Sequence, residues 1–169
     1  MATRYGLQKW FPDFFDRFGV LTVFDLLMEY IKSGRIKLDK SKITQRVAYH
    51  DPCNYGRKSE ELFGHGYYEE PRWILDQCVY DWVDLYPSKG NQYCCGGGGG
   101  TLLTPYREER LYYGRKKIEQ IKRTEAEMVV VPCHSCHGQI KAALEDNDMS
   151  EIPVKYLWEV VADILIVDE

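Results

Sequence analysis

The chain has 169 residues and a net charge of −4, and 44% of its residues are hydrophobic, as in a soluble globular protein. This length suits one domain with a substantial core. The acidic balance argues against a nucleic-acid-binding protein, and no apolar run approaches the roughly eighteen residues of a transmembrane helix. Because residues 1–9 lack the apolar stretch of a secretory signal, we expect a cytoplasmic protein without direct membrane insertion.

Residues 1–45 are predicted to form an aromatic-rich segment followed by one helix. The first twenty residues show no periodicity and are expected to be irregular. Apolar residues then recur at helical spacing from Leu21 to Ile31, and Gly34 is a natural helix stop. The early segment contains five large aromatic side chains that need a surface to bury them, on this domain or on a partner: Trp10, Phe11, Phe14, Phe15 and Phe18.

Residues 46–169 alternate between strand and helix signals. Short strands are predicted at 47–49, 91–93, 128–131 and 154–157. Helices are predicted over 74–85, over 134–144, over 158–165, and from a start at Thr104 and Pro105 to residue 121. The charge-rich part of that last helix, 107–123, is expected to be a solvated face. This alternation predicts an α/β fold with a mostly parallel sheet and helices on both faces.

Five of the six cysteines form a pattern along this second region. Cys53 stands alone, Cys94 and Cys95 are adjacent, and Cys133 and Cys136 form a Cys-x-x-Cys motif. Each group lies at or just beyond the C-terminal end of a predicted strand. Parallel strands place those ends along one edge, where open α/β sheets bind ligands, so we expect the three groups to converge.

Metal or cluster ligation explains this pattern better than disulfide bonds. A chain of this size has enough core without them, and adjacent cysteines such as Cys94 and Cys95 rarely pair with each other. Cysteine thiolates hold iron–sulfur clusters. Four cysteines also make a structural zinc site, which usually has two Cys-x-x-Cys-like knuckles, whereas this chain has one. Iron–sulfur and zinc therefore remain alternatives at this point.

The glycine run after Cys95 favours a cluster. Gly96, Gly97 and Gly98 let the backbone approach bulky sulfides and reach positive φ. Successive N–H groups in such a loop form a concave donor site for an anion. A phosphate-binding loop would need a lysine and a serine or threonine after the glycines, and residues 101–103 do not supply them.

The Cys-x-x-Cys motif read alone resembles a thioredoxin-type redox pair, but that interpretation leaves the other cysteines unexplained.

The remaining candidates are one cysteine and three histidines. Cys78 lies on an apolar helix face and is expected to pack in the core. His50, His134 and His137 flank the predicted site, where they would donate protons to a departing thiolate or hydrogen-bond to cluster sulfur. Helix capping or surface exposure explains each of them as well.

The residues around the cysteines carry a family resemblance. Residues 51–58 (Asp-Pro-Cys-Asn-Tyr-Gly-Arg-Lys), residues 94–99 (Cys-Cys-Gly-Gly-Gly-Gly) and the motif at 133–136 resemble the CCG domain of heterodisulfide reductase catalytic subunits. These motifs are most similar to those of DsrK subunits of the membrane-associated complex in dissimilatory sulfur metabolism. The resemblance covers about residues 20–166. Because those subunits are longer, it implies the C-terminal part of a longer protein.

The resemblance implies an iron–sulfur-dependent oxidoreductase that reduces a disulfide or trisulfide at a non-cubane [4Fe-4S] cluster. The implied substrate is a heterodisulfide or a small DsrC-like sulfur-carrier protein. The implied partners are other subunits of a membrane-associated redox complex, which would bring the chain to the inner face of the membrane. The alternative is a zinc- or cluster-stabilised docking module without activity of its own. The implied ligands are Cys53, Cys94, Cys95, Cys133 and Cys136.

Overall fold

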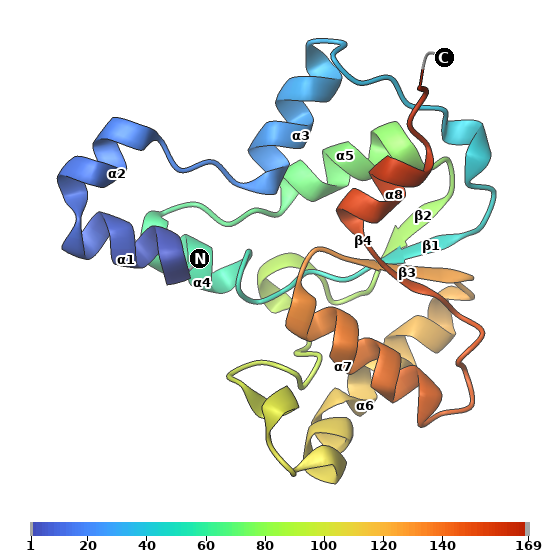
Figure 1. Cartoon of the computed structure of the whole chain (residues 1–169). Helices are drawn as coiled ribbons and strands as arrows, with labels where there is room; N and C mark the ends of the chain where they lie inside the picture. Colours follow the sequence, from blue (N-terminus) through green and yellow to red (C-terminus); the bar gives the residue numbers. More distant parts are fainter. Residues whose placement is uncertain (1, 168–169) are drawn as a thin grey trace.

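The computed structural model describes residues 2–167 and shows an α/β fold around a four-stranded parallel sheet (Figure 1). The order across the sheet is β2-β1-β3-β4. The predicted parallel sheet is confirmed. The expected domain limits at residues 1 and 169 lie outside the described residues. The strands are β1 (Val47–Tyr49), β2 (Trp82–Asp84), β3 (Met128–Val131) and β4 (Val154–Tyr156).

Helices cover both faces of the sheet, as predicted. In Figure 1, α3, α5 and α8 lie above the sheet, and α6 and α7 lie below it. The helices are α1 (Ala2–Trp10), α2 (Pro12–Phe18), α3 (Val23–Lys32), α4 (Arg57–Phe63), α5 (Glu69–Cys78), α6 (Arg107–Thr124), α7 (His134–Glu145) and α8 (Leu157–Asp163). Short 3-10 helices occur at Lys40–Lys42, Lys89–Asn91 and Thr101–Leu103.

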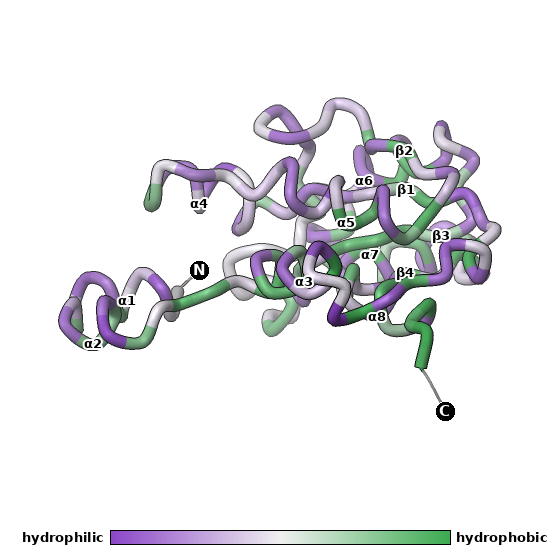
Figure 2. The backbone as a smooth tube through the Cα atoms, turned by 90° about the horizontal axis from the view of Figure 1, so that it is seen from above, coloured by the Kyte–Doolittle hydropathy of each residue, from purple (hydrophilic) through white to green (hydrophobic). Residues whose placement is uncertain are grey.

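The sheet separates two apolar clusters because successive strand residues point to opposite faces. Val47 and Tyr49 belong to the cluster between the sheet and helices α3, α5 and α8. Ala48 and Val129 belong to the cluster between the sheet and helices α6 and α7. The central strands β1 and β3 are buried throughout, and Figure 2 shows them as hydrophobic segments. Burial on both faces explains the continuous apolar run at 128–131.

The predicted helix over 74–85 ends early. Helix α5 stops at Cys78, and Val79 is extended. Trp82 instead begins β2, which pairs with β1. The spacing of Ile74, Cys78 and Trp82 fits a helix, but residues 82–84 gain backbone pairing at the sheet edge, where tertiary context overrides local pattern.

The strand predicted at 91–93 is wrong for a related reason. The sheet contains β2 (residues 82–84) between β1 and β3 in the sequence, and the Lys89–Asn91 segment forms a 3-10 helix. Cys94 and Cys95 therefore lie on a connection between β2 and α6, well past a strand end. The other two cysteine groups do follow strands β1 and β3.

Helix α6 begins later than predicted. Its first residue is Arg107, and its N-cap, Tyr106, makes no side-chain capping hydrogen bond. Thr104 instead donates its hydroxyl to the Thr101 carbonyl oxygen at 2.8 Å, because it ends the preceding 3-10 helix.

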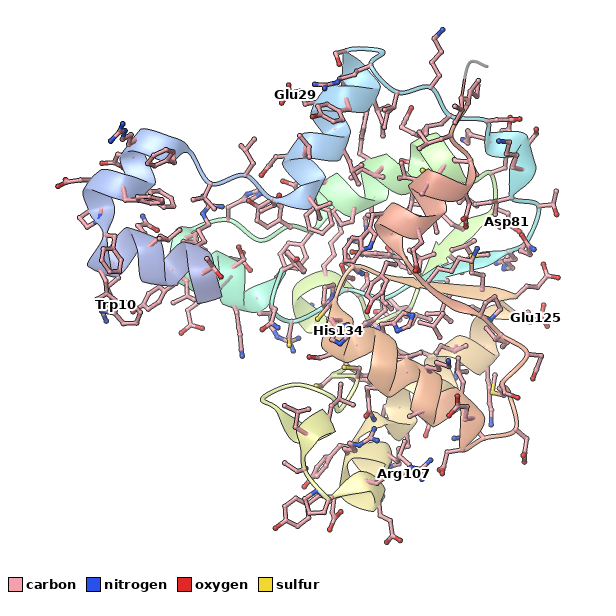
Figure 3. All side chains as sticks on the ribbon, in the orientation of Figure 1. Trp10, Glu29, Asp81, Arg107, Glu125 and His134 are labelled. Carbon is pink, nitrogen blue, oxygen red and sulfur yellow. The ribbon has the colours of Figure 1, made fainter. Side chains whose placement is uncertain are left out.

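Residues 2–10 and 12–18 are helical, so the prediction of an irregular segment is wrong. Helices α1 and α2 stand away from the sheet in Figures 1 and 2, and Trp10 projects from the end of α1 in Figure 3. Trp10, Phe11, Phe14 and Phe18 are exposed. Between residues 2 and 167, no helix is long and apolar enough to cross a bilayer.

Candidate functional site

The connections of the sheet point to one edge as a binding position. After β1 the chain adds β2 on one side of the sheet, and it then adds β3 and β4 on the other side of β1. Open α/β sheets bind ligands beyond the carboxyl ends of the two strands where the direction of strand addition reverses, which here are β1 and β3. Because β1 and β3 are parallel neighbours, Cys53 after β1 and Cys133 after β3 flank this position.

Cys95 and Cys136 meet although they are far apart in the sequence. Their Sγ atoms are 3.4 Å apart, and both residues are buried. Cys136 lies in the first turn of α7, directly after β3. The described thiols include no disulfide, and Cys94 is exposed while Cys53 is partly buried. We call Cys53, Cys94, Cys95, Cys133 and Cys136 the cysteine site; their role as ligands remains a prediction.

His50 joins this group. It follows β1, is 1% exposed, and neither ring nitrogen has a hydrogen-bond partner within residues 2–167. A ring nitrogen of His50 and the sulfur atoms of Cys95 and Cys136 all lie within 4.8 Å of one another. Buried polar atoms are rarely left unsatisfied, so this trio has the donor atoms and spacing of a site for a bound metal or cluster.

The other two candidate histidines have partners elsewhere. His134 Nδ1 is hydrogen-bonded to Tyr156 Oη at 2.6 Å, and His137 Nε2 donates to the Val154 carbonyl oxygen at 2.9 Å. Both rings stack on Tyr156. Figure 3 shows His134 at the start of α7, next to several sulfur atoms. Only His50 of the three therefore belongs to the group of possible ligand atoms in the described structure.

Thiol–thiol contacts divide the negative charge unevenly. A hydrogen bond from Cys136 lowers the pKa of Cys133 to about 6, and backbone N–H groups add to this shift. Hydrogen bonds from Cys136 and Cys94 hold the pKa of Cys95 well below its usual range. The pKa values of Cys136 and Cys94 are raised correspondingly, first by those same thiol contacts. Thiolates, the form that binds metals, are thus favoured at Cys95 and Cys133.

The glycine loop contacts both the cysteine sulfurs and α7. The N–H of Gly96 donates to Cys94 Sγ at 3.3 Å, and that of Gly97 donates to Cys95 Sγ at 3.4 Å. A Cβ at Gly97 would lie 2.6 Å from Gln139 Cβ, whereas Gly98 faces open space in the described chain. Glycine at 97 therefore permits close packing on α7, and the approach of the loop to sulfides remains a prediction.

Lys117 is the site residue that sequence reasoning missed. It lies within the segment 107–123, which was expected to be solvated, yet it is 1% exposed. The signal was its position: Gly114, Lys117, Ile118 and Ile121 follow helical spacing on one face of α6, so the lysine falls on the apolar stripe.

Gln139 and the Asp51–Arg72 ion pair were also missed. Gln139 is fully buried and donates to the Arg110 carbonyl oxygen at 3.0 Å, which joins α7 to α6. Arg72 of α5 reaches Asp51 at 2.7 Å and so fixes the segment between His50 and the cysteine site. An acidic residue directly after a buried strand was the available signal for Asp51.

A cavity opens beside the cysteine site. Its volume is about 360 Å³, and Cys133, His134, Tyr55 and Trp158 contribute to its wall. Aromatic side chains thus flank a thiol that is itself only 8% exposed. The cavity gives a small group or an extended side chain a route toward Cys133.

The profile of the CCG cysteine-rich domain family matches residues 47–141. The chain belongs to this family. The matched part begins at β1 and includes every cysteine of the cysteine site, so the CCG match and the converging thiols describe the same region. No solved structure matches the chain.

Three curated relatives are similar to most of this CCG chain. A probable membrane-anchored ferredoxin of Chromohalobacter salexigens is 33% identical over 81% of the chain and 19% of its own length. A subunit of the fumarate reductase (CoM/CoB) of Methanothermobacter marburgensis is 30% identical over 92% and 29%. A subunit of the dihydromethanophenazine:CoB–CoM heterodisulfide reductase of Methanosarcina barkeri is 28% identical over 88% and 34%. The chain thus spans between a fifth and a third of their lengths.

Proposed function

We propose that this CCG domain is an iron–sulfur redox domain. The convergence of Cys95 and Cys136, with Sγ atoms 3.4 Å apart beside the unpartnered ring of His50, carries the proposal. Relatives that are oxidoreductase subunits support it. The proposed ligands are Cys53, Cys94, Cys95, Cys133 and Cys136.

The donor set fits such a group. Soft thiolates select iron–sulfur clusters, zinc or copper(I), but tetrahedral zinc needs only four ligands, and the cysteine site holds five thiols. The backbone N–H groups of Gly96 and Gly97 already point at sulfur, as expected around an anionic cluster. A non-cubane [4Fe-4S] cluster is the form that we propose.

The proposed reaction is reduction of a disulfide or trisulfide. Cleavage of one S–S bond consumes two electrons and two protons; a disulfide gives two thiols, and a trisulfide gives one thiol and one hydropersulfide. When bound, the cluster would supply those electrons one at a time. The substrate would approach through the cavity beside Cys133. His134 lines that cavity and shares a proton with Tyr156 Oη across 2.6 Å, so we propose that it delivers a proton to the departing thiolate.

The finer proposal is a DsrK-like role. The motifs at 51–58 and 94–99 support it. The electron donors would be other subunits of a membrane-associated complex in sulfur metabolism, at the inner face of the membrane, and the substrate would be a heterodisulfide or a DsrC-like carrier protein. The heterodisulfide reductase subunit among the relatives supports a multi-subunit setting.

Anaerobic reconstitution tests the metal. The chain is purified without oxygen, incubated with iron and sulfide, and assayed for iron, acid-labile sulfide and zinc. We expect about four irons and four sulfides per chain and a paramagnetic signal. Stoichiometric zinc without iron would show the zinc-stabilised docking module instead.

Two cysteine variants form a matched pair for this assay. Cys95→Ala removes a thiol that is 4% exposed at the centre of the cysteine site, and Cys78→Ala removes a fully buried thiol in the other apolar cluster. We expect Cys95→Ala to lose most of its iron and Cys78→Ala to keep it. If Cys95→Ala keeps its iron and its signal, Cys95 is not a ligand. A separate assay tests the docking alternative. If the loaded, chemically reduced protein binds the trisulfide form of a DsrC-like protein but does not reduce it, docking is the function.

A further inference from the structure

Lys117 of α6 is buried as deeply as the core apolar side chains, with 1% of its surface exposed. In the part of the chain that the structure describes, its Nζ has no hydrogen-bond partner. A buried ammonium group is strongly unfavourable unless an anion compensates it. The position of Lys117 therefore requires either an anion nearby or a strongly reduced basicity.

Asp51, a carboxylate whose charge raises the pKa of Lys117, is already engaged. Asp51 accepts two hydrogen bonds from Arg72, at 2.8 and 2.7 Å, and a third from the Lys89 backbone N–H at 2.6 Å. The other groups whose negative charge raises the pKa of Lys117 are three thiols of the cysteine site. Burial is the larger effect and lowers the pKa to about 8, which still leaves the ammonium form dominant at neutral pH.

The face of α6 that carries Lys117 packs on the cysteine site. Gly114 lies one turn before Lys117 on the same buried face, and a Cβ added to it would lie 2.6 Å from the carbonyl oxygen of Cys95. Lys117 is therefore placed on the part of α6 that borders the cysteine site. Its positive charge also lowers the pKa of the buried His50, after the larger effect of burial.

We propose that the ammonium group of Lys117 is the buried counter-charge of the cysteine site and sets the reduction potential of the group bound there. This inference rests on the proposed iron–sulfur function. Lys117 would touch neither substrate nor electron donor; it would act through the charge of the sulfur-bound group.

The sign of the effect follows from charge alone. Reduction adds one negative charge to the site, and a fixed cation in a low-dielectric interior stabilises the more negative state. Replacing Lys117 with an apolar residue should make reduction harder. We expect the equilibrium constant for one-electron reduction to fall at least tenfold, which is a decrease of about 59 mV in potential.

The test uses three variants of the full chain after anaerobic reconstitution. Lys117→Met removes the charge and keeps an unbranched side chain, Lys117→Arg restores a cation, and Lys116→Met removes the exposed neighbouring charge as a control. Iron content is measured first, and the midpoint potential is then determined by a redox titration followed by electron paramagnetic resonance. Urea unfolding of each metal-free protein provides a readout that is independent of the cluster.

The expected result has two parts. Lys117→Met lowers the equilibrium constant for reduction at least tenfold, while Lys117→Arg and Lys116→Met stay within about threefold of the parent chain. Metal-free Lys117→Met is expected to keep a cooperative urea unfolding transition, so that a change in potential or iron content does not come from loss of the fold. Loss of iron in folded Lys117→Met that Lys117→Arg restores also supports the counter-charge.

Other outcomes overturn the inference. These are an unchanged potential in Lys117→Met, or loss of iron in both Lys117 variants. If the parent chain itself takes up zinc and no iron, the proposed function fails instead, and the two failures are thereby distinguished.

Discussion

Arg72 and Lys117 are buried basic side chains carried by helices on opposite faces of the sheet. Arg72 of α5 is paired with Asp51 and Asp84 at 2.7 and 2.6 Å. Lys117 of α6 has no hydrogen-bond partner among residues 2–167. The first cation completes a structural ion-pair network, whereas the second is left for something that the protein binds.

The buried thiols repeat this contrast. Cys78 lies in the cluster beneath α3, α5 and α8 among apolar side chains, and burial raises its pKa to about 12. Cys95, which packs against α6 and α7, contacts Cys136 and has a lowered pKa. Burial is common to both cysteines, so burial alone does not identify a site. Buried polar neighbours without hydrogen-bond partners, such as His50 near Cys95, distinguish the cysteine site from the surroundings of Cys78.

The largest expected effect concerns the paired cation. Arg72→Met leaves the buried Asp51 carboxylate without its charge partner and should lower the free energy of unfolding by about 3–5 kcal/mol. Urea unfolding followed by circular dichroism measures it. The control is Arg46→Met, which removes an exposed pair with Asp81 and should cost about 1 kcal/mol or less. Equal costs for the two variants would contradict the structural role assigned to the buried Arg72 pair.

The thiol contrast predicts a large difference in alkylation of the metal-free protein. At pH 7, Cys133, with a pKa of about 6, should react with iodoacetamide about a hundredfold faster than Cys78. Lowering the pH from 8 to 6 should slow Cys133 only about twofold, because about half of it is still thiolate at pH 6, and should slow Cys78 about tenfold per pH unit. Mass spectrometry of the labelled peptides gives both rates. Similar rates and pH profiles would contradict the assignment of thiolate to this side of the sheet.

The smallest expected effect tests how the cysteine loop packs on α7. Gly97→Ala places a methyl group 2.6 Å from Gln139 Cβ and should cost about 1–3 kcal/mol of stability. Gly98→Ala meets no described atom within 4 Å and should change stability by less than about 0.5 kcal/mol. Unfolding curves and iron content are compared for the pair. If Gly98→Ala is the more damaging change, the loop packs differently.

Local pattern was sufficient for the centre of the fold. The run at 128–131 is apolar throughout because β3 is buried on both faces, and the helix from His134 follows it directly, so the Cys133–Cys136 motif could be placed between strand and helix. Local pattern failed at Trp82, since an edge strand exists only through pairing with Val47. It failed again at Cys94, which reaches its position by packing of the following glycines.

The sequence by itself determined the parallel α/β core, the CCG cysteine pattern and the separation of Cys78 from the other five thiols, because apolar runs and motif spacing are local properties. Only the tertiary structure decided that Cys95 meets Cys136, that His50 is left unpartnered, and that Lys117 is covered. A charge becomes buried through whatever packs over it. Helical spacing places Lys117 on the apolar stripe of α6, but the groups that pack over this stripe are determined by the fold.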